Sequence, residues 1–251
     1  MLEGALKIKE TAARCKRWRM PALGLTDTNN MCGALEFSDI MAGEGVQPII
    51  GVTLSLDLEL DAQPGQLRRD PDGTVALLAQ TETGYENLMA LSSAAFLDVE
   101  ATDLPHVAAS RLEGYSGDVI ALTGGPDGAL NRLICAGRLE EAEKWLDRLI
   151  AYFPDRLYVE LQRHGLSNEI EAEKTLIAWA YDKGLPLVAT NEPYFLLVEG
   201  KRLDHPMLEA GDRKRMKVLR VNSQEDLPIE TVNVVLQEAL DLYRNGTIKT
   251  K

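Results

Sequence analysis

Residues 156–190, RLYVELQRHGLSNEIEAEKTLIAWAYDKGLPLVAT, begin and end in short apolar runs. The runs 156–162 and 185–190 have the length and the Leu and Val content of buried strands. Between them, Asn168 and Glu171 have the spacing of a capping box that begins a helix, and Gly184 stands where a C′ glycine ends one. Two strands joined through a helix predict a βαβ unit, because parallel strands need a crossover connection.

The same alternation extends towards the N-terminus. Four further strands are predicted at 20–26, 47–56, 74–79 and 118–123, and further helices at 4–18, 34–42, 85–96 and 139–153. Thr83 and Glu86 form a second capping-box pattern, whereas 60–73 is rich in turn residues and is predicted as a loop. Six apolar strands separated by helices predict an α/β fold with a parallel sheet. A barrel and an open doubly wound sheet both fit, although no glycine-rich phosphate-binding motif follows any strand.

The composition is that of a soluble globular domain, with 251 residues of which 45% are hydrophobic and 26% charged. No stretch approaches the ~20 apolar residues of a membrane span, and the start MLEGALKIKE lacks the apolar core of a secretory signal. The three cysteines form no CxxC pair, which favours reduced thiols and a cytoplasmic location. Cys32 and Cys135 are predicted as buried small residues, and Trp145 and Leu146 as core.

The net charge is −12, from 27 basic and 39 acidic residues. Binding to nucleic acid draws much of its affinity from neutralised phosphates, so this balance disfavours nucleic-acid contact by the domain alone. A local exception is the basic run within 213–220, which is interpreted as a solvated surface segment.

Several blocks of the chain occur together in a known family. The segments MPALGLTDTNNMCGALEF, QPIIGVTLSL, LLAQTETGYENLMALSS, VIALTGGPDGAL, LYVELQRHGL and GLPLVATNEPYF resemble, in order and spacing, one domain. It is the N-terminal polymerase and histidinol phosphatase (PHP) domain of bacterial DNA polymerase III alpha subunits. The resemblance covers roughly residues 2–198 and implies an α/β fold, a distorted TIM-like (β/α)7 barrel. The family's first strand would precede Leu2 and is missing from this sequence. Residues 199–251 are predicted as an appendage with a basic segment and a helix near 229–243.

The resemblance also implies where a metal site would lie, at the carboxyl ends of the strands. Active members hold a trinuclear cluster of His, Asp, Glu and sometimes Cys, which cleaves phosphoesters with metal-activated water. Position by position, the family's ligands are lost in this chain at Thr28, Thr53, Thr74, Gly125 and Tyr194. The vestigial candidates are Asp27, Asn29, Glu192 and His205.

Each surviving polar residue has a structural interpretation beside the functional one. Asp27 and Asn29 are interpreted as residues that cap a helix or fasten a loop, and Glu192 as a hydrogen-bonded loop carboxylate. His164 is interpreted as a positioned structural histidine, because the three histidines lie far apart without ligand spacing. We therefore expect no catalytic residue and no tightly held metal.

By resemblance, the chain is expected to be an inactive structural and protein-interaction module in DNA replication. Its expected partners are the polymerase core of the same parent chain and the proofreading exonuclease subunit, with no membrane. Nucleotidyl transfer would belong to the parent polymerase, whose absent palm would hold magnesium. Two alternatives stay open: a metal-dependent phosphoesterase or 3′–5′ proofreading exonuclease, and a fragment without an independent role, whose sheet edges would be exposed.

Overall fold

The computed structural model describes residues 6–60, 70–100, 102–191, 208–209 and 218–219. The chain divides into two compact units, one of Lys7–Glu192 and one of Met1–Leu6 with Pro193–Lys251. In the second unit the described strands β8 (Leu208–Glu209) and β9 (Val218–Leu219) pair antiparallel. The predicted boundary after residue 198 and the predicted helix near 229–243 lie outside the described residues.

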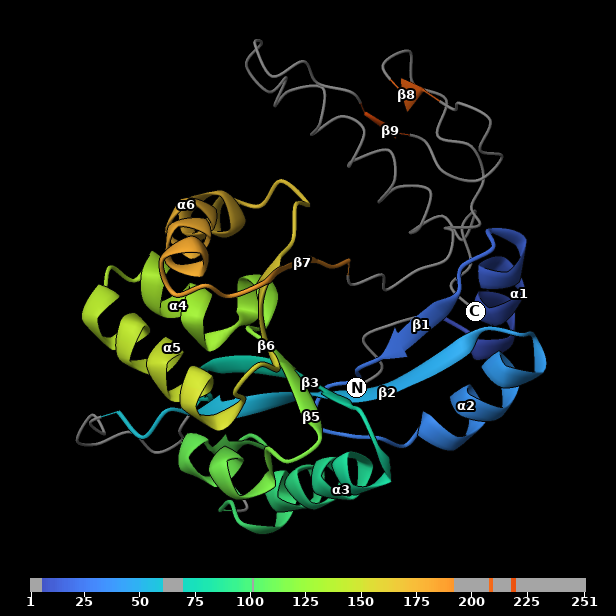
Figure 1. Cartoon of the computed structure of the whole chain (residues 1–251), viewed down its shortest axis with the longest axis horizontal. Coiled ribbons are helices and arrows are strands. Elements are labelled where there is room, and N and C mark those ends of the chain that lie inside the picture. Colours follow the sequence, from blue (N-terminus) through green and yellow to red (C-terminus); the bar gives the residue numbers. More distant parts are fainter. Residues whose placement is uncertain (1–5, 61–69, 101, 192–207, 210–217, 220–251) are drawn as a thin grey trace, which may run out of the picture. The chain divides into compact units, whose positions relative to one another are not determined.

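The larger unit is built on one curled sheet with helices packed against it (Figure 1). The strand order is β1-β2-β3-β5-β6-β7, with the short β4 paired to β2. All six predicted strands are present, and the α/β fold class is confirmed. The strands are β1 (Ala22–Leu25), β2 (Gln47–Asp57), β3 (Gly73–Ala79), β4 (Val107–Ala108), β5 (Val119–Leu122), β6 (Leu157–Leu161) and β7 (Leu187–Ala189).

One prediction about the sheet is wrong, because β3 runs antiparallel to both of its neighbours, β2 and β5. The pairs β1–β2, β5–β6 and β6–β7 are parallel, as expected. The segment between β2 and β3 was itself predicted as a loop, and a loop lets the chain reverse without the crossover that parallel pairing needs. The predicted loop permits this reversal, and the pairing of β3 with β2 and β5 in the sheet sets its direction.

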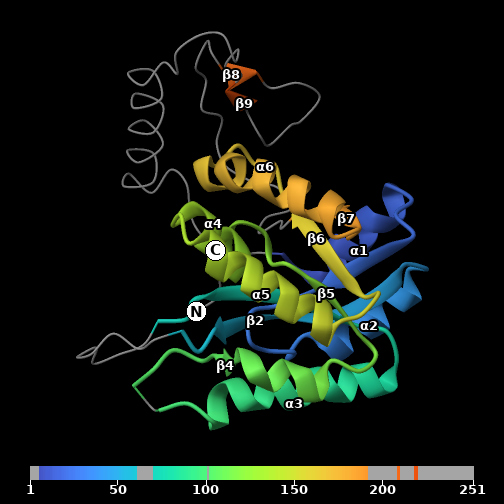
Figure 2. The same ribbon diagram turned by 60° about the vertical axis from the view of Figure 1, so that its left-hand side comes forward.

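Helices cover the sheet on more than one side (Figure 2). Helix α3 contacts β2, β3 and β5, whereas α4 contacts β3, α5 and α6. The sequence patterns missed α4, which is only seven residues long. The helices are α1 (Ile8–Arg17), α2 (Ala34–Gly43), α3 (Glu82–Leu97), α4 (Ala129–Cys135), α5 (Leu139–Tyr152) and α6 (Ser167–Asp182), with 3-10 turns η1 (Ala109–Tyr115) and η2 (Gly125–Asp127). Within the described ranges no helix is both long and apolar enough to cross a bilayer.

Both predicted capping boxes have the wrong register. Helix α3 is capped by Thr81, whose Oγ1 accepts from the backbone N–H of Gly84 at 3.3 Å, so Thr83 already lies in the first turn. At α6 the carboxylate that reaches back is Glu169, which accepts from the N–H of Leu166 at 3.0 Å. Both helices begin one or more residues earlier than the patterns indicated, and the cap moves with the first turn.

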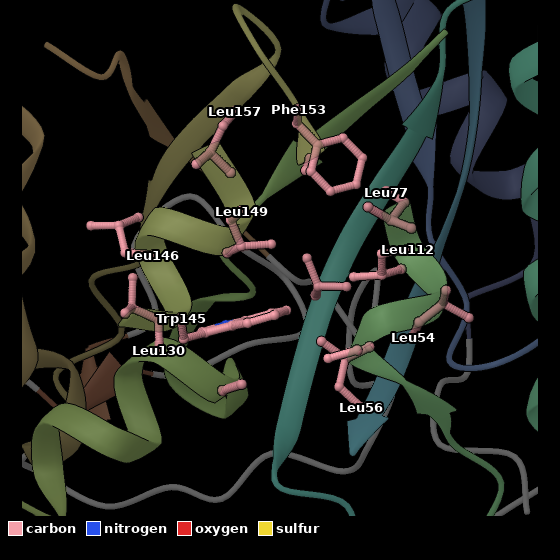
Figure 3. Close-up of a cluster of buried hydrophobic side chains, with 14 of the residues drawn as sticks. Leu54, Leu56, Leu77, Leu112, Leu130, Trp145, Leu146, Leu149, Phe153 and Leu157 are labelled. Carbon is pink, nitrogen blue, oxygen red and sulfur yellow. The ribbon is translucent and has the colours of Figure 1, made fainter. Parts of the chain in front are cut away.

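The main core lies between the sheet and the helices α3, α4, α5 and α6. Figure 3 shows α4–α5 side chains facing leucines of β2 and β3. Trp145 and Leu146 are 3% and 0% exposed, so their prediction as core is confirmed. Fully buried side chains in this cluster are Leu54, Leu56, Leu77, Leu88, Leu112, Leu130, Leu146, Leu149 and Phe153.

A second, smaller core joins α1 and α2 to β1. Ala12 and Cys15 of α1 pack with Phe37 and Met41 of α2. The buried cysteine is thus Cys15, whereas Cys32 is exposed and Cys135 only partly buried. The prediction that Cys32 is buried is wrong, because it lies in the turn before α2 and outside the apolar face of that helix.

Candidate functional site

Two groups of polar residues lie at the carboxyl ends of strands. The first, here the Asn29 cluster, comprises Asp27, Thr28 and Asn29 after β1 with Thr53 and Ser55 of β2. Backbone hydrogen bonds continue the β1–β2 pairing through it, from Thr53 N–H to the Asp27 carbonyl at 3.2 Å and from Asn29 N–H to the Thr53 carbonyl at 2.8 Å. Thr28 and Thr53, both predicted as lost ligand positions, thus stand opposite each other as a parallel bridge.

Asn29 is buried and its side chain is fully used within the fold. Its Nδ2 donates to Ser55 Oγ and to the Pro105 carbonyl, both at 3.0 Å, and its Oδ1 accepts from the Ser55 N–H at 2.8 Å. Its backbone φ is +55°, in the left-handed region, which Asn tolerates better than most residues. Asn29 therefore fastens the loop after β1 to β2 and to the segment before β4, in line with its structural interpretation.

Asp27 lies on the outer side of the same cluster. The residue as a whole is exposed, yet burial around its carboxyl group raises the pKa above the ordinary value for aspartate. Desolvation of the charged form explains that direction. Asp27 is the member of the cluster whose oxygens could face a ligand, but the residues beside it, Thr28 and Asn29, bring no second carboxylate.

The second group, here the Glu160 cluster, joins the ends of β5, β6 and β7. It comprises Thr123, Gly124, Glu160, Gln162 and Thr190. Glu160 is only 5% exposed. Its Oε2 accepts from Gly124 N–H at 3.0 Å, and its Oε1 accepts from Gln162 Nε2 at 3.2 Å and from the Thr190 hydroxyl. Three neutral donors from three strand ends thus converge on one carboxylate.

The cluster is closed by further bonds among its members. Gln162 Nε2 also donates to Thr190 Oγ1 at 3.1 Å, and the backbone N–H of Glu160 donates to Thr123 Oγ1 at 3.0 Å. Buried polar groups that hydrogen-bond one another make a site rigid, because the removal of one group leaves its partner without a hydrogen bond. The Glu160 cluster is therefore a hydrogen-bond network that joins three strand ends, rather than a group of side chains free to bind a metal ion.

The family resemblance places a His or Cys ligand at Gly125. This glycine lies directly against the Gln162 side chain of the Glu160 cluster. Its φ is +57°, and a Cβ built on it would stand 2.8 Å from Gln162 Nε2. Real Cβ atoms do not approach so closely, so the flexible end of the Gln162 side chain would have to move, and side chains other than Gly and Asn avoid that backbone region. The amide of Gln162 thus occupies the space into which a side chain at position 125 would extend.

Thr74 also sits in closely packed backbone. It forms a bridge with Gly128, and a Cβ on Gly124 would come within 2.5 Å of the Thr74 carbonyl oxygen. The remaining predicted positions, Glu192, Tyr194 and His205, lie outside the described residues.

His164 is held at both ring nitrogens. Its Nδ1 lies 2.8 Å from Glu169 Oε1, and its Nε2 lies 2.7 Å from Asn191 Oδ1. Glu169 Oε2 accepts three backbone N–H groups, from His164, Gly165 and Leu166, at 2.8–3.0 Å. Burial acts to raise the pKa of Glu169, but the hydrogen bonds from His164 and from the Leu166 and His164 amides outweigh it and lower the pKa. This geometry agrees with a positioned structural histidine.

Sequence reasoning missed the roles of Glu160 and Glu169. Glu160 was visible as one acidic residue inside the otherwise apolar run LYVEL, which indicates a buried partner set. Gln162 entered the sequence analysis only as the last residue of the predicted strand 156–162. No short-range pattern pairs it with Thr190, because the two lie 28 residues apart in the chain.

The described residues do not fit a multi-metal cluster. Within the described ranges, no three His, Cys, Asp or Glu side chains gather in a way that could hold a metal ion. Hydroxyls at Thr28, Thr53 and Thr74 and the bare backbone of Gly125 are poor substitutes for imidazole and carboxylate ligands. The carboxylate oxygens of Glu160 are already engaged.

Comparison with known proteins places the chain in a family. The family model described as "PHP domain" matches residues 1–164, so the chain belongs to the PHP domain family. Its curated relatives are DNA polymerase III alpha subunits. That of Caulobacter vibrioides is 43% identical over 195 residues, which cover 78% of this chain and 17% of the relative. That of Rickettsia prowazekii is 35% identical over 194 residues, which cover 77% of this chain and 16% of the relative.

A relative from Borreliella burgdorferi matches further along the chain, at 30% identity over 243 residues, covering 90% of this chain and 21% of the relative. The chain therefore spans about a fifth or less of the length of these relatives. Two solved structures are also similar. An amidohydrolase from Chromobacterium violaceum is 14% identical with a TM-score of 0.43, and the match covers 76% of this chain and 84% of the other. A protein assigned as a metal-dependent phosphoesterase from Bifidobacterium adolescentis is 11% identical with a TM-score of 0.45, and the match covers 94% of this chain and 92% of the other.

Proposed function

We propose that this PHP domain is a non-hydrolytic structural and protein-binding module of a DNA polymerase III alpha subunit, acting in DNA replication in the cytoplasm. The single observation that carries the proposal is the position of Gln162. Its amide fills the space beside Gly125 that a ligand side chain would need, and it bonds Glu160 and Thr190 instead.

The chemistry of phosphoester hydrolysis supports the same conclusion. A metal-activated water requires several converging ligands that fix the ion and leave it open to substrate. Of the two carboxylates in these clusters, that of Glu160 already accepts hydrogen bonds at both oxygens, which leaves Asp27 as the candidate ligand. One carboxylate beside threonine hydroxyls holds a divalent ion weakly.

The proposed module acts through contacts with other proteins. We assign nucleotidyl transfer, and the magnesium that it needs, to other regions of the parent polymerase. The proposed partners are the polymerase core and the proofreading exonuclease subunit. A pull-down with this chain as bait tests that part, and retention of neither protein would contradict it.

The absence of hydrolysis is tested by metal binding and activity together. After chelation and dialysis, the chain is titrated with Mn²⁺ or Zn²⁺ in a calorimeter and assayed on bis-p-nitrophenyl phosphate and on 3′-labelled single-stranded DNA. We expect no stoichiometric binding and no chelator-sensitive cleavage. Two or more tightly bound ions, with cleavage that Asp27→Asn abolishes, would instead establish a phosphoesterase or a 3′–5′ exonuclease.

A further inference from the structure

Helix α6 carries apolar side chains on two opposite faces. Its inner face packs against α4 and β6 (Figure 2). The outer face is turned to solvent, although Leu166 is 50% exposed, Ile170 69% and Tyr181 78%. A helix that is apolar on both sides is normally covered on both sides, because large exposed apolar patches are uncommon on a protein that acts alone. The buried apolar residues of the inner face are Ala172, Leu176 and Ala180.

The outward residues of α6 form one continuous surface. Residues at positions i, i+4, i+7 and i+11 of a helix lie on the same side of it. The residues with this spacing are Ile170, Lys174, Ile177 and Tyr181, of which Ile177 is half-buried and the others are exposed. Leu166 stands four residues before Ile170 and extends the row by one turn. These five residues, here the α6 surface, span about 22 Å along the helix, since each residue rises ~1.5 Å.

Helix α5, which packs against the same helix α4, has an outer face of a different kind. Among the residues of α5, all of which the structure describes, Leu139 is the single large apolar side chain that is exposed. One such residue is common on a protein surface. The apolar outer face of α6 is therefore a local property of that helix. The exposed charged residues of α5 are Glu140, Glu143, Lys144 and Asp147.

One cation lies in the middle of the α6 surface. Lys174 is exposed, and among the described residues no ion pair engages it. The adjacent carboxylate, that of Glu173, pairs with Arg163 at 2.8 Å instead. A lysine covered by an apolar partner loses its hydration, which is costly unless a carboxylate meets it. A molecule that covers this surface must therefore bring an acidic group to its centre.

A second copy of the chain does not meet this requirement. Lys174 is close to the midpoint between Leu166 and Tyr181, so a twofold axis through the middle of the α6 surface brings the two Lys174 side chains together. Like charges repel at that point. Anionic membranes and nucleic acids bind through several cations, whereas this surface offers one, in a chain of net charge −12.

We propose that the α6 surface binds an amphipathic helix of a partner protein, which has apolar residues along one face and a carboxylate at the centre of that face. The outward row of α6 supplies a ridge that packs into the groove between side chains of such a helix. Ile170 and Tyr181 make apolar contacts, and Lys174 pairs with the carboxylate. The inference deepens the proposed function, on which it rests, because it gives the protein-binding module a surface and its partner a chemistry.

The test measures fluorescence anisotropy of a labelled helical peptide titrated with the full chain. The peptide has about 18 residues, enough to match the α6 surface, with leucines along one face and one glutamate at the centre of that face. A twin peptide carries lysine in place of the glutamate. Ile170→Asp is expected to weaken binding of the glutamate peptide at least about tenfold. Lys174→Glu should weaken it about tenfold and should make the lysine peptide the better ligand.

The matched controls carry the same changes on α5. Leu139→Asp and Lys144→Glu should leave the affinity within about twofold, because these residues lie outside the α6 surface. Both aspartates stand in the first turn of their helices, where an acid is favourable, so the variants keep the fold. The inference is overturned if the glutamate peptide does not bind, if the controls weaken binding as much as the α6 variants, or if Lys174→Glu does not reverse the preference between the two peptides.

Two further measurements identify other occupants of the surface. A dimer in analytical ultracentrifugation that Ile170→Asp dissociates would assign the surface to a second copy. Binding to phosphatidylcholine vesicles that the same change abolishes would assign it to a membrane, and either result overturns the inference. Retention of neither protein in the pull-down contradicts the proposed function, whereas peptide binding that Ile170→Asp leaves unchanged contradicts the α6 surface alone.

Discussion

The Asn29 cluster and the Glu160 cluster occupy comparable places, each at the carboxyl ends of neighbouring strands, but they are satisfied differently. In the Asn29 cluster a neutral amide accepts from Ser55 N–H of β2 and donates to Ser55 Oγ and to the Pro105 carbonyl before β4. In the Glu160 cluster an acidic side chain gathers neutral donors from three strand ends. The comparison shows that an acidic residue at a strand end can have a structural role, because both of its carboxylate oxygens accept hydrogen bonds from neighbouring strand ends.

The largest expected effect is at Glu160. Glu160→Ala removes the acceptor of three hydrogen bonds, from the half-buried Gly124 N–H, the Gln162 amide and the Thr190 hydroxyl, so we expect a loss of about 3–5 kcal/mol in the free energy of unfolding. Glu160→Gln keeps one acceptor oxygen and should lose about half as much. Urea denaturation measures both, with the exposed Glu140→Ala as control. A loss below about 1 kcal/mol for the alanine variant would show that the hydrogen-bond network is not structural.

The next largest loss of stability is expected at Asn29. Two substitutions there distinguish the contribution of its side-chain hydrogen bonds from that of backbone strain. Asn29→Ala should cost about 2–4 kcal/mol, because Ser55 N–H and the Pro105 carbonyl lose their partner and alanine is strained at φ +55°. Asn29→Gly should cost about 1 kcal/mol less, since glycine adopts that φ freely. Equal losses would mean that the backbone is not strained. Asn30→Ala, with exposed hydrogen bonds, is the control.

A smaller and pH-dependent effect is expected at Glu169, in the first turn of α6. Its folded-state pKa is lowered, so its carboxylate stabilises the fold above the unfolded pKa of about 4.3 and that stability is lost as the pH falls through the folded pKa. Glu169→Gln should cost about 1–2 kcal/mol at pH 7 and flatten the acid limb of the stability curve. The control is Glu171→Gln, an exposed neighbour on α6. An unchanged acid limb in Glu169→Gln would contradict the assignment.

The smallest effect has the opposite sign and concerns Asp27, a member of the Asn29 cluster. Its pKa is raised in the folded state, so ionisation favours unfolding and stability falls as the pH rises through the interval from about 3.9 to the folded pKa. Asp27→Asn should therefore raise the Tm slightly at pH 7 and leave it unchanged near pH 3. Thermal unfolding at both pH values checks this. A lower Tm at pH 7, or a Tm that Mn²⁺ raises in the wild type only, would point to a ligand role.

Much of the fold could be predicted because its signals are local. The runs 47–56 and 118–123 are apolar enough to be strands wherever they occur, and they became β2 and β5. The capping residues Thr81 and Glu169 were each missed by two positions, because several polar residues precede each helix and only packing selects its first turn. The direction of β3 required the sheet itself.

By itself, the sequence determined the alternation of strands and helices and the apolar core around Trp145. These are properties of single residues and of short periodic patterns. Only the tertiary structure decided that Gln162 fills the space beside Gly125 and that Glu160 binds Gly124 and Thr190. Those contacts join residues 30 to 37 positions apart. The free energy of burying a carboxylate is set by partners that only the folded sheet brings together.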